Sequence, residues 1–342
     1  MAADHNTAGL TPSFTAMADL ASARLGGRAI AANDEFFAPK SSLVRPEPSI
    51  VIPGKFTVRG KWMDGWETRR RRTPGHDWCV VALGMRGVIR GVNVDTSHFT
   101  GNYPTHCSLD AIDSGQTPSP AICAAEGAPW VTIVPRTPLR GNGDNFLAVA
   151  DERPWTHVRL NIFPDGGVAR LRVYGAVAVD WLRMARRRRA IDVASITNGG
   201  LVIGASDMHF GAKDNMIMPG RAANMGDGWE TRRRRGPGHD WAIVRLGTTA
   251  SVSKVEIDTN HFKGNYPESA SLDGCNVPSS SFQDLGSASW TVILPRTTLR
   301  PHHRHVFSRE LSDAGPVSHV RLNIFPDGGI SRLRVYGHVA GH

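Results

Sequence analysis

The sequence predicts an all-β protein that consists of two tandem jelly-roll (β-sandwich) domains. The prediction rests on a long internal repeat, on short stretches in which apolar and polar residues alternate, and on the glycine and proline residues that separate these stretches. Many short strands joined by turns are typical of sandwiches and jelly rolls. Neither copy of the repeat contains a long amphipathic helical pattern, so we expect little helix.

The internal repeat is the strongest of these signals. GWETRRRRTPGHDW begins at Gly65 and GWETRRRRGPGHDW at Gly228, so thirteen of fourteen residues recur 163 positions apart. The same spacing relates DTSHFTGNYP, which begins at Asp95, to DTNHFKGNYP, which begins at Asp258. HVRLNIFPDGG recurs at a spacing of 162. Spacing this steady indicates two copies of one domain, with small insertions or deletions in the loops.

The repeat sets the predicted domain boundaries. With 342 residues the chain is long enough for about two domains. We predict an N-terminal tail (1–27), a first repeat (28–176), a linker (177–198) and a second repeat (199–342). The linker is rich in arginine, matches no other part of the chain and could form a short helix.

Strand patterns fill each copy. In residues 157–163 apolar and polar side chains alternate, a Pro-Asp-Gly-Gly turn follows, and residues 168–174 resume the alternation. This pattern predicts a hairpin. The stretch that begins at Trp78 and the run 88–94 predict two further short strands.

Charge and cysteine content narrow the class of partner. The formal net charge of +9 favours anionic partners, whether small acids, nucleic acid or a membrane surface. Nucleic acid is not expected, because neither copy interleaves aromatic and basic residues as known modules do. No apolar run reaches membrane-spanning length, no secretory signal pattern is present and the four cysteines form no CxxC pair. We therefore expect a cytoplasmic protein without a membrane partner, with buried, reduced thiols.

The arginine runs 69–72 and 232–235 allow two interpretations. In an extended segment Glu67, Arg69 and Arg71 would share one face, and the residues between them the other. The arginines of one face could form structural ion pairs with carboxylates. Alternatively, at least one arginine in each copy holds a ligand carboxylate through two parallel hydrogen bonds.

Two histidine motifs are shared by the copies. His76 stands beside Asp77 just after a turn, and His98 follows a predicted strand. Each histidine could be a hydrogen-bonded structural group or a proton carrier. Two His and two Asp per copy could also form a metal site, but there is no HExxH or CxxC motif. No P-loop or dinucleotide fingerprint occurs, so ATP and nicotinamide cofactors are not expected.

Taken together, the shared blocks resemble the allantoicase family. They are DGWETRRRR, GHDW, DTxHFxGNYP and RLNIFPDGG in both copies, with NDEFFA from Asn33 and SDMHFG from Ser206. The resemblance runs from about Arg28 to the C-terminus. It implies two jelly-roll domains of the galactose-binding-like type, homo-oligomers, and hydrolysis of allantoate to ureidoglycolate and urea during recovery of purine nitrogen.

The chemistry of allantoate gives a hypothesis for the site. Its central carbon bears one carboxylate and two ureido groups, so a cation must hold the carboxylate and a proton must reach the departing nitrogen. We assign His98 as general acid and Glu67 as base, with His76 and Asp77 as alternates. We assign substrate binding to the remaining shared polar residues. Arg69 or Arg71 binds the carboxylate, and Asn102 is a further substrate-binding residue. The second-copy counterparts are His261, Glu230, His239, Asp240, Arg232, Arg234 and Asn265.

Two alternatives stay open. A divalent metal ion could activate the water, although no cofactor is certain. The chain could also be a non-catalytic tandem binding module for small anions or sugars, since jelly rolls often hold ligands without acting on them.

Overall fold

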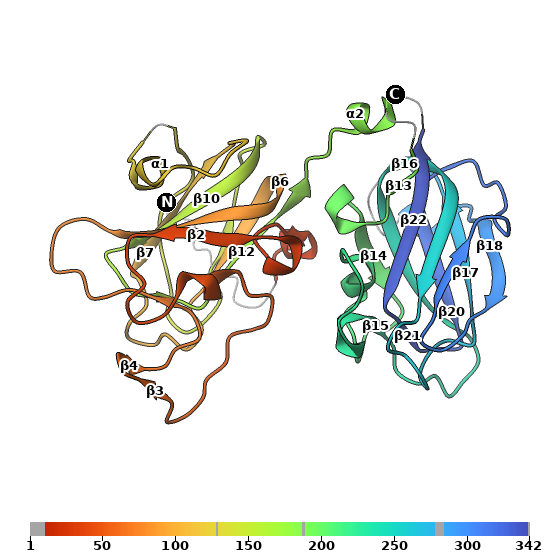
Figure 1. The fold of residues 1–342 in the computed structure, drawn as a ribbon, viewed down its shortest axis with the longest axis horizontal. Helices are drawn as coiled ribbons and strands as arrows, with labels where there is room; N and C mark the ends of the chain where they lie inside the picture. The colour runs from red at the N-terminus through yellow and green to blue at the C-terminus, as the bar shows by residue number, and fades with distance from the viewer. Residues whose placement is uncertain (1–10, 128, 187–188, 278–283, 341–342) are drawn as a thin grey trace, which may run out of the picture. The chain divides into compact units, whose positions relative to one another are not determined.

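The computed structural model describes residues 11–127, 129–186, 189–277 and 284–340. Contacts divide the chain into two compact units, Met1–Ala178 and Val179–His342 (Figure 1). Strands make up most of the regular secondary structure of both units. The longest described α-helices are α1 (Pro120–Ala124) and α2 (Trp181–Arg186), and no helix in the described part is long and apolar enough to cross a membrane.

The first unit contains an eight-stranded antiparallel sheet with the order β1-β12-β6-β10-β7-β8, to which β2 and β9 add by pairing with β6. Its strands are β1 (Ala18–Asp19), β2 (Arg28–Ala32), β6 (Asp77–Asp95), β7 (His106–Ile112), β8 (Val131–Pro138), β9 (Phe146–Ala148), β10 (Pro154–Phe163) and β12 (Arg170–Val177). Two short ribbons complete the unit: β5 (Trp66–Glu67) with β11 (Gly167–Val168), and β3 (Phe56–Thr57) with β4 (Gly60–Lys61).

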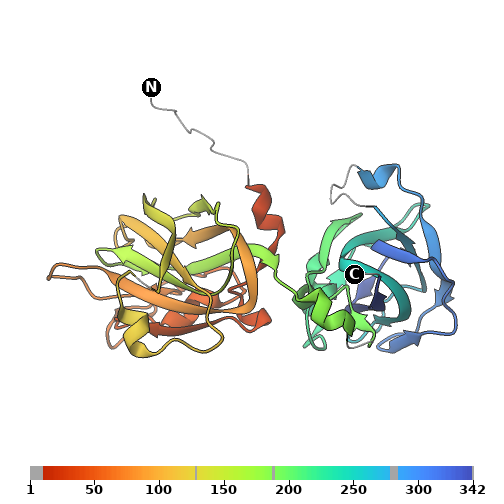
Figure 2. The ribbon, with the colours of Figure 1, turned by 90° about the horizontal axis from the view of Figure 1, so that it is seen from above.

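The long strand β6 joins two layers. Its first part, up to Ala82, pairs with β2 on one side and β10 on the other. Its last part, from Gly87, pairs with β12 and β9. In Figure 2 the strands of each unit curve around its interior. One strand shared by two layers is the arrangement expected of a jelly-roll sandwich.

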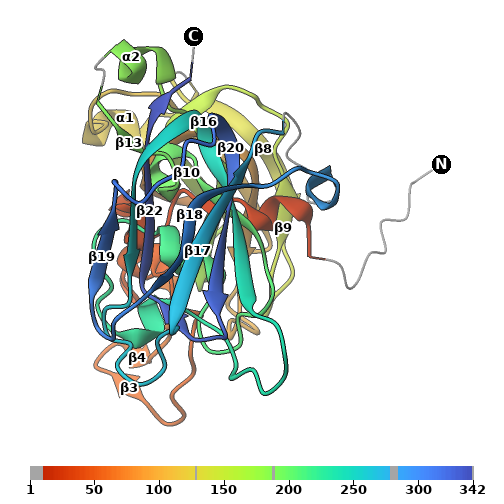
Figure 3. The same cartoon turned by 90° about the vertical axis from the view of Figure 1, so that its right-hand side faces the viewer.

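The second unit repeats this topology, with the order β13-β22-β16-β20-β17-β18 and with β14 and β19 on β16. Figure 3 shows β17, β18 and β20 side by side. The strands are β13 (Ile191–Asp192), β14 (Leu201–Ala205), β16 (Asp240–Asp258), β17 (Ser269–Cys275), β18 (Thr291–Thr298), β19 (Arg304–Phe307), β20 (Pro316–Phe325) and β22 (Arg332–Val339), with β15 (Trp229–Glu230) paired to β21 (Gly329–Ile330). The prediction of an all-β tandem repeat is confirmed.

The predicted hairpin is wrong. Strands β10 and β12 do not pair with each other, because β6 lies between them and bonds to both. The Pro-Asp-Gly-Gly turn leads instead into β11, which pairs with β5. Residues 78–94 also form one continuous strand rather than two. The pairing partners are distant in sequence, so local turn chemistry could not reveal them.

The sheets extend beyond the predicted repeat boundaries. Ala18–Asp19, placed in the tail, pairs with β12, and Ile191–Asp192, placed in the linker, pairs with β22. Asp19 accepts hydrogen bonds from the backbone N–H groups of Ala21 and Val173. These two-residue strands are too short to give an alternation pattern in the sequence.

The core follows the predicted alternation of β10. Val158, Leu160 and Ile162 are fully buried. The intervening polar residues are buried too: Arg159 forms a 2.8 Å ion pair with Asp110 and donates to the Cys123 carbonyl oxygen. The opposite face of this strand is therefore covered rather than solvated.

All four cysteines are free and buried, as expected: Cys79, Cys107, Cys123 and Cys275. Burial raises the pKa of the Cys107 thiol to about 12 and that of Cys275 to about 11. Both thiols stay protonated near neutral pH and are poor nucleophiles.

Candidate functional site

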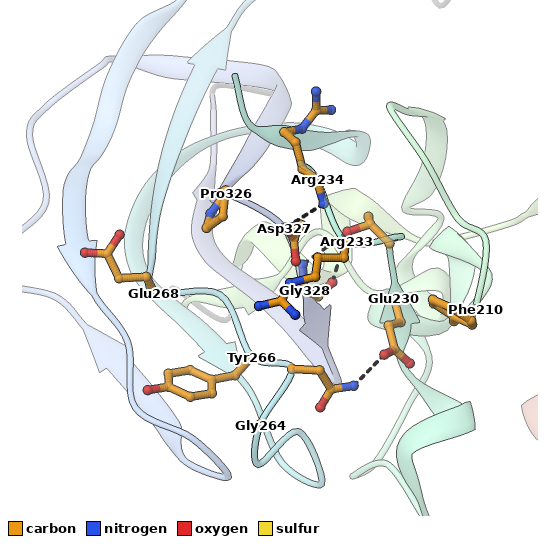
Figure 4. Close-up of a pocket in the computed structure, with 12 residues that line it drawn as sticks. Phe210, Glu230, Arg233, Arg234, Gly264, Tyr266, Glu268, Pro326, Asp327 and Gly328 are labelled. Atoms are coloured by element: carbon orange, nitrogen blue, oxygen red, sulfur yellow. Dashed lines mark hydrogen bonds between the residues drawn. The ribbon is translucent and has the colours of Figure 1, made fainter. Parts of the chain in front are cut away.

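A cavity of about 520 Å³ opens in the second unit (Figure 4). Its walls come from Phe210, from the end of β15 and the segment after it, from the loop before β17 and from the turn between β20 and β21. The lining residues are Phe210, Glu230, Thr231, Arg233, Arg234, Gly264, Asn265, Tyr266, Glu268, Pro326, Asp327 and Gly328. Most of them belong to the blocks that the two copies share.

The ribbon of β15 and β21 fixes the floor of this site. Trp229 is fully buried and donates from Nε1 to the Asp207 carbonyl oxygen at 2.8 Å. The next residue, Glu230, pairs with Gly329 across the ribbon. Gly328 has φ 132°, and a Cβ there would lie 2.7 Å from the Asn265 carbonyl oxygen, so only glycine fits. These constraints hold Glu230 and Asn265 against each other.

The structure brings the predicted carboxylate and amide together in both copies. Asn265 Nδ2 donates to Glu230 Oε1, and Asn102 Nδ2 donates to Glu67 Oε1 at 2.6 Å. Burial raises the pKa of Glu67, and the Asn102 hydrogen bond only partly opposes it. Glu67 therefore keeps its proton to a higher pH than an ordinary glutamate, as a group that exchanges protons requires.

The arginines that were predicted to bind a ligand carboxylate form ion pairs with carboxylates of the protein instead. Arg69 Nε lies 2.6 Å from Asp34 Oδ2, and Arg71 Nη1 lies 2.8 Å from the buried Asp77. The same two pairs recur in the second copy, Arg232 with Asp207 and Arg234 with Asp240. For these four residues the geometry favours structural ion pairs.

The remaining arginine of the motif faces the cavity instead. Arg233 lines the cavity, and Figure 4 shows it pointing between Glu230 on one side and Tyr266 on the other. Within the described ranges, neither Arg233 nor its counterpart Arg70 has a hydrogen bond or ion pair. The predicted alternation failed here because the strand ends at Glu230, and the arginines after it follow an irregular path.

His76 and Asp77 do not form a dyad. Asp77 is buried and accepts from Arg71 and Asn33. The His76 ring packs on Phe163 with 4.7 Å between centroids, and burial lowers the pKa of His76. In the second copy His239 packs on Phe325 in the same way, and Asp240 pairs with Arg234. Asp77 and Asp240 thus anchor the arginine segment.

His98 and His261 lie outside the cluster around the glutamate. Both adopt the left-handed conformation, with φ 73° and 71°. Their Nε2 atoms hydrogen-bond the carbonyl oxygens of Ser49 and Ala222 at 3.2 and 2.9 Å. His261 is not among the residues that line the cavity. The ring of His98 contacts a neighbouring loop, and its assignment as general acid stays a prediction.

Nowhere in the described ranges do three or more His, Cys, Asp or Glu side chains gather so that they could hold a metal ion.

Comparison with known proteins shows to which protein family the chain belongs. The family model described as "Allantoicase repeat" matches residues 18–178 and 191–340, which together make up most of the sequence. The chain belongs to the allantoicase family. Each of the two allantoicase repeats contains one shared set of glutamate, asparagine and arginine residues.

Full-length relatives agree with this placement. "Probable allantoicase 1" of Burkholderia mallei is 51% identical over 329 residues, which cover 95% of this chain and 96% of that protein. "Probable allantoicase" of Ralstonia nicotianae is 48% identical over 95% of this chain and 96% of its own length. The crystal structure of allantoicase from Saccharomyces cerevisiae has a TM-score of 0.78 and 32% identity, covering 94% of this chain and 92% of that one. The predicted family and fold are confirmed.

Proposed function

We propose that this protein hydrolyses allantoate to ureidoglycolate and urea in purine degradation. The family match over both repeats supports this proposal most strongly. The cavity adds chemical support, because it combines a guanidinium, an amide and a carboxyl group. A sugar-binding module is not favoured, since the relatives that match the whole chain are named as allantoicases.

We propose that Arg70, or Arg233 in the second copy, holds the substrate carboxylate. Its guanidinium forms no ion pair with an acid of the described residues, and a guanidinium can bind a carboxylate through two parallel hydrogen bonds. The Asn102 side chain donates to Glu67, which leaves its amide oxygen to accept from a ureido N–H. The substrate carbon would then lie near Glu67.

Glu67 can serve as both acid and base. In its protonated form it gives its proton to the ureido nitrogen that leaves, while the lone pair of the other ureido nitrogen forms a C=N bond as the C–N bond breaks. Urea departs, and the Glu67 carboxylate takes a proton from the water that adds to the C=N carbon. This step yields ureidoglycolate and restores the protonated acid. The raised pKa of Glu67 favours the first step.

Replacing Arg70 and Arg233 together with alanine tests substrate binding. We expect kcat/KM for allantoate to fall roughly 10- to 100-fold, mainly through KM, because a charge-assisted hydrogen-bond pair is lost. The matched control is R72A/R235A, which removes two exposed arginines of the same runs. Equal kinetics of the two double variants would contradict the role of Arg70 and Arg233.

Replacing His98 and His261 together with asparagine tests the alternative acid. Asparagine tolerates the left-handed conformation that both positions adopt. We expect kcat to stay within about threefold of the unaltered protein, since an acid–base catalyst contributes about 10²–10⁴-fold. A hundredfold loss of kcat in a variant that unfolds at a similar temperature would restore these histidines as catalysts.

Two further properties are part of the proposal. We propose a cytoplasmic location, which suits four free, buried thiols. We also propose that the protein forms homo-oligomers, as the family resemblance implies; size-exclusion chromatography with light scattering measures this directly, and a monomer would contradict it.

A further inference from the structure

We infer that the two repeats are not equivalent: the site of the first repeat binds the anionic substrate, and Glu268 weakens the corresponding site of the second. The inference rests on the proposed function. It assigns the difference to one position, which is Thr105 in the first repeat and Glu268 in the second.

The two sites are otherwise almost identical in sequence. Of the twelve residues that line the second-unit cavity, eleven have an identical counterpart in the first repeat. The equivalent contacts recur as well: Phe37 and Phe210 each donate a backbone hydrogen bond to the glutamate that follows the buried tryptophan. Only Glu268 has a different counterpart, Thr105. Any functional difference that arises within the lining must therefore come from this position.

In the second repeat Glu268 forms an ion pair with an arginine beside the cavity, Arg296. Its Oε2 accepts from Arg296 Nη2 at 3.0 Å. Arg296 Nε donates to Ser269 Oγ at 2.7 Å, and the guanidinium lies 4.1 Å from the centre of the Phe325 ring. Glu268 therefore adds a negative charge to the wall of the cavity, and it neutralises the positive charge of Arg296.

The corresponding cation of the first repeat is Arg136. Arg136 lies over the Phe163 ring at 4.5 Å, just as Arg296 lies over Phe325. Thr105 cannot pair with it and donates instead to the Phe163 carbonyl oxygen at 3.0 Å. Among the residues that the structure describes, Arg136 has no hydrogen-bond acceptor or carboxylate partner. The first site therefore offers the guanidinium of Arg136 to an anion, whereas Glu268 neutralises the corresponding guanidinium of the second site.

An insertion adds a further cation to the first site. The segment from Lys40 to Gly65 is ten residues longer than its counterpart from Lys213 to Gly228, and it contains the β3–β4 ribbon. From the ribbon's turn, Arg59 Nη1 donates to the Phe36 carbonyl oxygen at 2.7 Å, next to Phe37. Phe37 is the counterpart of Phe210, which lines the cavity. Arg59 and the unneutralised Arg136 both favour binding of a carboxylate in the first site.

Binding of a non-reacting anion tests the difference. N-carbamoylglycine carries a carboxylate and one ureido group but lacks the second ureido group of allantoate. In isothermal titration calorimetry we expect one strong site per chain of the unaltered protein. T105E should weaken this site roughly tenfold or more, because a charge-assisted hydrogen bond is lost. E268T places the first repeat's residue in the second repeat and should raise the number of strong sites to two.

Steady-state kinetics gives an independent measurement. T105E should raise KM for allantoate roughly tenfold with kcat changed less than threefold, a split that a general loss of folding would not produce. T117E is the matched control, because it adds the same charge at an exposed loop position outside the site, and it should keep both constants within about twofold of the unaltered protein.

The outcomes separate this inference from the proposed function. Two equal sites in the unaltered protein, or no effect of T105E, would overturn the inequivalence and leave allantoate hydrolysis standing. No turnover of allantoate and no binding of N-carbamoylglycine by the folded, unaltered protein would overturn the proposed function itself.

Discussion

Replacing Glu67 and Glu230 together with glutamine should lower kcat for allantoate by about 10²–10⁴-fold, the range attributed to a general acid–base group. Glutamine keeps the size of the side chain and can still bond to Asn102, so the site should stay assembled while proton transfer is lost. Stopped assays of urea release measure the effect. The single variants E67Q and E230Q then show how much of the loss in kcat each repeat contributes. E67Q should lose at least tenfold more activity than E230Q.

The pH dependence supplies a second readout for the same group. Because burial raises the pKa of Glu67, its protonated form persists to higher pH than that of a free glutamate. The first chemical step uses this protonated form, so kcat should fall as the pH rises through the raised pKa. E152Q is the control, since Glu152 is exposed and pairs with Arg90 at 3.3 Å. If E67Q/E230Q retained more than a tenth of the kcat, the assignment of Glu67 would be wrong.

Replacing Arg170 with alanine should lower the free energy of unfolding of the first unit by about 3–5 kcal/mol, the cost of removing one partner from a buried ion pair. Arg170 Nη2 lies 2.7 Å from Asp64 Oδ2, and the two side chains are 2% and 5% exposed. The other guanidinium bonds reach the carbonyl oxygens of Glu47, Pro48, Asp64 and Ala169. Urea-induced unfolding followed by tryptophan fluorescence measures the change.

The matched control for Arg170 is an exposed ion pair of the same kind. Arg86 Nη2 lies 2.7 Å from Asp113 Oδ2, with side chains 46% and 38% exposed. R86A should cost no more than about 1 kcal/mol, because solvent screens an exposed pair. A similar loss of stability in R170A and R86A would contradict the structural role given to the buried pair.

The sequence was most informative where its pattern is local or repeated. The repeat predicted two similar domains, and alternation in residues 157–163 predicted the core positions Val158, Leu160 and Ile162. The hairpin was wrong because β6, the strand between β10 and β12, comes from a distant part of the sequence. Pairing between distant segments leaves no local signature in a single sequence.

For the candidate site, the structure shows which of the predicted residues lie together. The pairing of Glu67 with Asn102 agrees with the shared blocks that suggested both residues. The choice of Arg69 or Arg71 for the carboxylate stays a prediction, but the alternation on which it relied ends at Glu67, where β5 ends. Nothing in the spacing shows that Asp34 and Asp77 would occupy Arg69 and Arg71. Likewise, only the structure shows that His98 has a positive φ and bonds to the Ser49 carbonyl oxygen.

Direct assay of allantoate turnover tests the central claim. The purified protein would be incubated with allantoate, with and without prior chelation of divalent metal ions, and urea and ureidoglycolate would be measured. We predict release of both products in equal amounts, and survival of activity after chelation would agree with proton transfer by Glu67. Loss of activity on chelation with recovery on metal addition would assign the activation of water to a bound ion. No turnover by the folded protein in either the chelated or the metal-supplemented sample would contradict the account.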